Sequence, residues 1–65
     1  MKVIDLIKLK IACENFIDDK MSDDDVKILA NNGYIDTVES NGKLVFVYPS
    51  KDDLRKVIQK INSKL

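Results

Sequence analysis

The sequence predicts a small α+β domain in which two helices precede an antiparallel two-stranded β-hairpin and one helix follows it. Three patterns indicate this order: two Ser-initiated helix starts, an Asn-Gly turn between β-branched runs, and apolar residues with helical periodicity toward both ends of the chain. The 65 residues are enough for one domain. We therefore predict a single domain over residues 1–65.

The first helix is expected over residues 2–17, where the apolar side chains form two arcs around the helix axis. One arc contains Ile4, Ile7 and Ile11. A helix that is apolar on two sides must be covered on two sides, so we predict that the other arc is a dimer interface. That arc consists of Leu6, Leu9, Cys13, Phe16 and Ile17. Residues 7–11 also alternate with period two, which leaves a short strand as the alternative there.

The second helix is expected over residues 22–32 because both of its ends carry clear signals. Ser22 fits the N-cap, and Asp25 lies at the reciprocal position of a capping box. Gly33 suits the left-handed position that follows many helices. The helix should therefore begin and end close to these residues.

A β-hairpin is expected over residues 34–48, because Asn41-Gly42 is the strongest signal for a two-residue type I′ turn. A turn at this point places Val38 opposite Val45. The second strand is apolar on both faces, so we expect it to be more buried than the first strand.

The third helix is expected over residues 51–64, with a basic polar side and one apolar stripe. The stripe consists of Leu54, Val57, Ile58, Ile61 and Leu65.

The small size of the chain predicts that it needs a partner. A domain of about 60 residues buries only about 60% of its unfolded surface, so its stability is marginal without an additional constraint. The chain has one cysteine and no histidine, which excludes an internal disulfide and makes a structural zinc site unlikely from the sequence. We therefore expect a homodimer or a complex with another protein.

Nothing in the sequence indicates an enzyme. It contains no histidine, no nucleophile–base pair and no glycine-rich phosphate loop. Cys13 lies among apolar residues, where a thiol is an inert space-filling group. The acidic cluster over residues 18–25 lacks the spacing of a calcium loop. We expect no catalytic residue, metal ligand, cofactor or small-molecule substrate.

The apolar start of the chain is interrupted by Asp5, Lys8 and Lys10, so it fits neither a membrane span nor a signal peptide. A cytoplasmic protein without a membrane partner is expected.

Charge is unevenly distributed although the net charge is zero. Residues 21–40 carry a net charge of −4, and residues 41–65 carry a net charge of +4. The basic end is suited to an anionic partner, whereas the acidic segment would repel one.

The segment from Leu29 to Ser50 resembles the passage from recognition helix to wing in winged helix-turn-helix DNA-binding domains. The resemblance is carried by Gly33-Tyr34-Ile35 after the helix and by Asn41-Gly42-Lys43 at the hairpin turn. It covers about a third of the chain, and it implies a small dimeric DNA-associated transcription regulator that binds double-stranded DNA. The matching helix opens with three Asp, which would repel phosphate. The expected nucleic-acid-binding residues are therefore Lys27, Asn31, Asn32, Lys43, Lys51, Arg55, Lys56 and Lys60.

The alternative is a protein-binding module, such as a phage- or plasmid-type inhibitor or adaptor of a larger host protein. The two-sided first helix, the neutral net charge and the absence of a catalytic motif favour it. Placement of charge separates the two hypotheses. A basic face shared by the hairpin tip and the last helix favours DNA, whereas interleaved acids and bases favour a protein partner.

Overall fold

The structure is a computed structural model that describes residues 2–65. It confirms the α+β class and the order of the elements. The elements are α1 (Val3–Ile17), α2 (Asp23–Asn31), β1 (Asp36–Ser40), β2 (Lys43–Val47) and α3 (Lys51–Lys64). All predicted elements are present: both ends of α3 and the end of α1 are as predicted, and the other ends differ by one or two residues. Because α1 is helical from Val3 onward, the strand alternative for residues 7–11 is wrong.

The capping signals act as the sequence predicts. The Ser22 hydroxyl accepts a hydrogen bond from the backbone N–H of Asp25, and the Asp25 carboxylate accepts one from the N–H of Ser22. At the other end of α2, Gly33 has φ +82°, and the N–H of Tyr34 donates to the carbonyl of Leu29 at 2.9 Å. This Schellman pairing satisfies carbonyls that the helix end would otherwise leave free.

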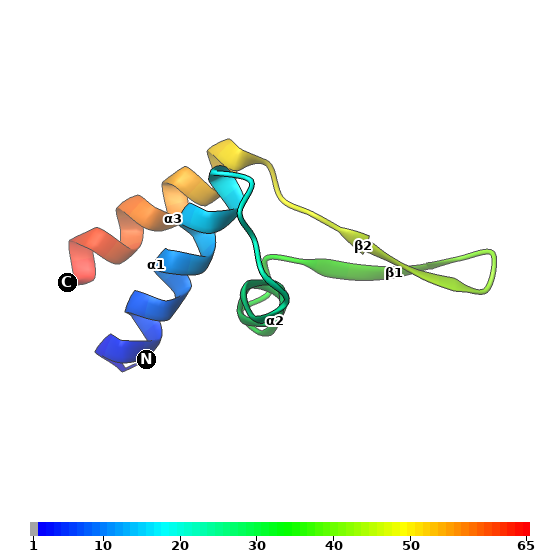
Figure 1. Cartoon of the computed structure of the whole chain (residues 1–65), viewed down its shortest axis with the longest axis horizontal. Coiled ribbons are helices and arrows are strands. Elements are labelled where there is room, and N and C mark those ends of the chain that lie inside the picture. The colour runs from blue at the N-terminus through cyan, green and yellow to red at the C-terminus, as the bar shows by residue number, and fades with distance from the viewer. Residues whose placement is uncertain (1) are drawn as a thin grey trace.

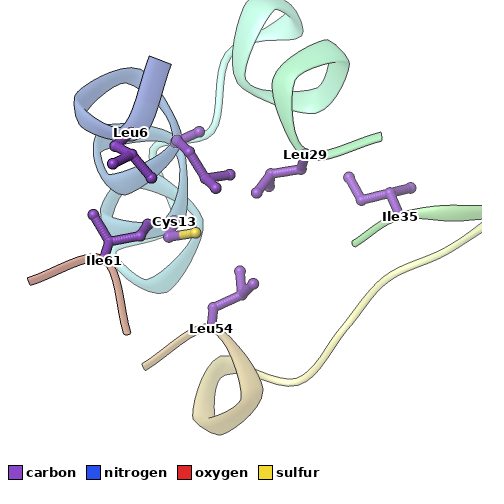
Figure 2. Packing of buried hydrophobic residues seen from close by; sticks show 8 residues of the cluster. Leu6, Cys13, Leu29, Ile35, Leu54 and Ile61 are labelled. Atoms are coloured by element: carbon purple, nitrogen blue, oxygen red, sulfur yellow. The ribbon is translucent and has the colours of Figure 1, made fainter. Parts of the chain in front are cut away.

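The core lies where α2 and α3 pack against α1, which lies between them in the fold. The side chains of Cys13, Leu29 and Leu54 are fully buried. Figure 2 shows these side chains pointing toward one another from the three helices, with Ile35 entering from the start of the hairpin. The hydrophobic core is therefore small and is built almost entirely by the helices.

The predicted dimer interface on α1 is wrong, because that arc forms the internal core. Leu6, Leu9 and Cys13 are buried within one chain, and the half-buried Phe16 and Ile17 pack against the same cluster. The arc is covered by α2 and α3, so no second chain is needed to shield it. The sequence correctly indicated two apolar sides of the helix but not which of them faces inward.

The hairpin has the predicted register, with Val38 opposite Val45, and its turn residues Asn41 and Gly42 both have positive φ. The predicted burial of the second strand is wrong. Every residue of both strands is exposed, because the helices pack on α1 and none of them covers a face of the sheet. Figure 1 shows the hairpin extending away from the three helices. We call this projecting hairpin the arm.

The arm gives the molecule more surface than its size requires. The accessible surface is 4820 Å² for a 7.4 kDa chain. A compact monomer of this mass exposes about 4200 Å². The radius of gyration is 12.4 Å, compared with about 11 Å for a compact chain of this length. The excess surface is therefore about 600 Å², which is the signature of an element without intramolecular cover.

Candidate functional site

The expected DNA-contacting residues of α2 are only partly available. Lys27 and Asn31 are exposed one turn apart. Asn32 is half-buried, and its side-chain amide donates to the carbonyl of Ile28 at 2.7 Å. The amide of Asn32 therefore satisfies the end of α2, and two polar side chains remain free for an external ligand on this part of the helix.

The expected basic residues of α3 interleave with acids at the start of that helix. Lys51 forms an ion pair with Asp19 at 3.1 Å, and Arg55 pairs with Asp52. Lys56 is exposed further along α3. Two of the cations predicted to contact phosphate are thus already paired with carboxylates within the chain.

The structure does not gather these residues on one surface. Lys43 follows the hairpin turn, and Figure 1 shows that turn at one end of the long axis of the molecule, with the C-terminus near the other end. The molecule is 42 Å long. Lys43 and the last turns of α3 therefore cannot contact the same short stretch of ligand.

One surface cleft brings together the expected residues Asn32 and Lys60, and a second brings together Asn31 and Asn32. The first cleft has a volume of about 310 Å³, and residues of α1, of α3 and of the segment after α2 line it. It is lined by Leu6, Leu9, Asn32, Tyr34, Val57, Lys60, Ile61 and Lys64. The Asn32 amide is already hydrogen-bonded to Ile28, and together with Lys60 it does not form a nucleophile–base pair.

The buried carboxylate of Asp25 has a structural role. It is 6% exposed, and one of its oxygens accepts hydrogen bonds from the backbone N–H of Ser22 and the side-chain amide of Asn15, each at 3.0 Å. Burial favours the neutral form, but these hydrogen bonds outweigh that effect and lower the pKa of Asp25. The carboxylate therefore joins α1 to α2 as an anion. The contribution of Asn15 cannot be predicted from the sequence, because its hydrogen bond joins two different helices.

Cys13 has the setting of an inert thiol, as predicted. It is fully buried, and burial together with the charge of Glu14 raises the pKa of the thiol to about 11. Within residues 2–65, no group of acidic or cysteine side chains is arranged to hold a metal ion. No helix in that range is both long and apolar enough to cross a bilayer.

Apart from Leu65, the exposed large apolar side chains lie on two elements of the fold, the hairpin and α1. The first is the arm, where the second strand and its flanks are about half exposed. Its large apolar residues are Val38, Leu44, Val45, Phe46, Val47 and Tyr48. The second surface is the side of α1 that faces away from the core, which we call the ridge. It consists of Val3, Ile4, Ile7 and Ile11. Contiguous apolar surface of this kind marks interaction sites on small proteins.

An aromatic row connects the arm to the body. The rings of Phe16 and Tyr48 are 6.2 Å apart, and those of Tyr48 and Phe46 are 6.3 Å apart. Tyr48 is therefore anchored at the base of the arm, whereas Leu44 near the tip is 77% exposed. Sequence reasoning missed this surface. The apolar run from Leu44 to Tyr48 is visible in the sequence, but an apolar strand predicts burial, whereas these side chains are exposed.

Comparison of the chain with protein-family models, with curated proteins and with solved structures gives no match.

Proposed function

We propose that this chain is a protein-binding module. The observation that carries the proposal is the large apolar surface on the arm and on the ridge, which no other part of the described chain covers. Water contact with this surface costs about 25 cal/mol for each Å². A partner protein that covers it gains this free energy, so both surfaces favour protein association.

The pattern of charge supports a protein partner over a nucleic acid. Specific DNA binding relies on several unpaired cations that contact phosphates on one surface. Here Lys51 and Arg55 are paired with acids, and α2 begins with Asp23 and Asp24 exposed to solvent. Such interleaved charge is typical of the polar rim around an apolar protein interface.

The experiment is quantitative affinity capture from extract of the source cells, with two matched variants. In the first, Ile7 and Ile11 are both changed to lysine, which places charge on the ridge without altering a core residue. In the second, Lys27 and Lys56 are both changed to glutamate, which alters exposed charge elsewhere. We expect a protein recovered in stoichiometric amount with the wild type and the second variant and lost with the first. If neither the wild type nor either variant recovers a protein in stoichiometric amount, the proposal is contradicted.

A DNA-associated regulator is the second candidate. Two specific observations favour it: α2 is followed directly by a hairpin, and Lys27 and Asn31 are exposed on α2. A helix that leads into a hairpin is the passage that the winged-helix resemblance covers. A titration with random duplex DNA at low and at moderate salt separates the candidates. The protein-binding proposal expects no complex, whereas binding that weakens steeply with salt would favour the regulator.

A further inference from the structure

The arm has a free edge whose hydrogen-bonding groups follow from its register. A two-residue turn closes on a hydrogen-bonded pair, here Ser40 with Lys43. Hydrogen-bonded pairs then alternate along the ladder, so the backbone groups of Val45 and Val47 point toward β1. The backbone N–H and C=O groups of Leu44, Phe46 and Tyr48 therefore point outward. Their side chains share one face of the sheet.

The two edges of the arm differ in how they are protected. The β1 strand carries Asp36 and Glu39, and charged side chains are a common protection against edge-to-edge pairing. In β2 the only charged residue is Lys43 beside the turn, and the stretch from Leu44 to Tyr48 carries no charge and no proline. A short, uncharged run of high β propensity on an open edge is a template for strand addition.

We propose that the β2 edge pairs with the β2 edge of a second copy of this chain, in antiparallel orientation with Phe46 at the two-fold axis. The inference deepens the proposed function, on which it rests, by naming the partner of one surface. This register places Leu44 of each copy opposite Tyr48 of the other. All three outward-facing residues of each strand then find hydrogen-bonded partners, and the two hairpins form one four-stranded sheet.

Charge and area favour a second copy as the occupant. Antiparallel pairing of β2 with itself brings no like charges together, whereas pairing of β1 with itself would place Glu39 of both copies in the same short ladder. The side chains of Leu44, Phe46 and Tyr48 are 77%, 52% and 48% exposed, so the pairing buries apolar area that the monomer leaves in contact with water. The pairing is also bounded in both directions, by the turn residue Gly42 that precedes β2 and by α3, which begins at Lys51.

The pairing leaves the ridge on α1 uncovered. Each end of the four-stranded sheet would carry one helical body, because the two arms run in opposite directions. The dimer would thus present two copies of the ridge to further partners, which increases the avidity of any protein that contacts both.

The test compares two proline variants that differ only in which edge they alter. Phe46 and Thr37 are cross-strand neighbours, and the N–H of each points away from the hairpin ladder. Phe46→Pro removes a donor from the β2 edge, and Thr37→Pro removes one from the β1 edge. Sedimentation equilibrium over a wide concentration range measures the mass. Wild type and Thr37→Pro are expected to approach twice the 7.4 kDa chain mass. Phe46→Pro should weaken dimerisation at least about tenfold.

A second variant protects the test against misfolding of the arm. Phe46→Lys retains the backbone donor but places two ammonium groups at the two-fold axis, so it should also weaken the dimer, more strongly at low salt. A wild-type chain that stays monomeric throughout, or equal dimerisation by Phe46→Pro, Phe46→Lys and wild type, would overturn the inference. These outcomes are distinguishable from failure of the proposed function. A monomer that captures another protein through the ridge refutes only the self-pairing, and a dimer of this design without any other partner refutes only a heterologous role.

Discussion

The carboxylate of Asp25 connects the start of α2 to the end of α1 with two hydrogen bonds to one oxygen. A buried anion is costly unless its oxygens are hydrogen-bonded, and here one oxygen accepts from both Ser22 and Asn15. Asp19 illustrates a different compromise. It follows α1 in the left-handed region with φ 59°, a position where glycine is usual. Single side chains therefore both stabilise and strain the two helix ends that meet at the turn.

Replacement of Asp25 by asparagine should make the protein less stable at neutral pH by about 1–2 kcal/mol. The folded-state pKa of Asp25 lies below its unfolded value. Its contribution is therefore fully present above the unfolded pKa of about 3.9 and is lost as the pH falls through the folded pKa. Denaturant titrations between neutral pH and pH 2 measure this, and Asp25→Asn should show a shallower loss of stability at acid pH. The exposed neighbour provides the control, because Asp24→Asn removes a carboxylate from the same turn and leaves the hydrogen bonds of Asp25 in place.

Replacement of Asp19 by glycine should stabilise the protein by about 0.5–1 kcal/mol, because glycine adopts the left-handed conformation without steric cost. The variant also loses the ion pair with Lys51, but both side chains are largely exposed, so that loss is small. Thermal unfolding followed by circular dichroism measures the change. Lys51→Met, which removes the ion pair alone, should leave the unfolding temperature nearly unchanged. A decrease for Asp19→Gly equal to that of Lys51→Met would refute the argument from strain.

At the scale of elements, the arm forms from local signals and depends little on the rest of the molecule. Its turn has positive φ at Asn41 and Gly42, and its ladder needs no contact with the helices. An isolated two-stranded hairpin is marginally stable in water. The arm should therefore open more readily than the helices. Pairing of its apolar edge with another strand would stabilise it.

Gly42→Val tests this independence. A β-carbon at Gly42 would meet no atom within 4 Å, so the cost lies entirely in the backbone, where φ is +77°. We expect faster amide exchange throughout the hairpin and a weaker dimer, while the helical unfolding transition of the monomer shifts little. Hydrogen exchange followed by NMR measures both regions in one sample. An equal loss of protection in α1 and in the hairpin would show that the arm and the body unfold together.

At the scale of the whole molecule, the stability depends on a small core on one side of α1. Leu29 and Leu54 are fully buried and come from the two helices that cover α1. In a chain of this size the total stability is a few kcal/mol, so one buried leucine is a large fraction of it. Apart from the contact of Tyr48 with Phe16, most of the apolar surface on the arm and the ridge is exposed in the monomer and remains available for association.

Leu54→Ala should cost about 2–5 kcal/mol, which is enough to unfold much of the monomer at room temperature. Leu44→Ala removes the same atoms from a side chain that is 77% exposed and should cost less than about 0.5 kcal/mol in the monomer. Urea unfolding at low protein concentration compares the two variants. In the proposed β2–β2 dimer, Leu44→Ala should also weaken dimerisation. This decrease in stability relative to the wild type should appear only as the protein concentration rises.

Local chemistry alone predicted the elements of this protein, because caps, turns and helical periodicity depend on residues a few positions apart. The capping and turn residues act on backbone groups within a few positions of themselves, so their effect can be predicted from the sequence. They are Ser22 with Asp25, Asn41 with Gly42, and Gly33. The inward side of α1 and the exposure of β2 were decided by tertiary packing. An apolar arc reports that a surface must be covered, but which element covers it depends on how α2 and α3 share one helix between them. Both helices pack on the arc of Leu6, Leu9 and Cys13, and no helix remains to cover the arm.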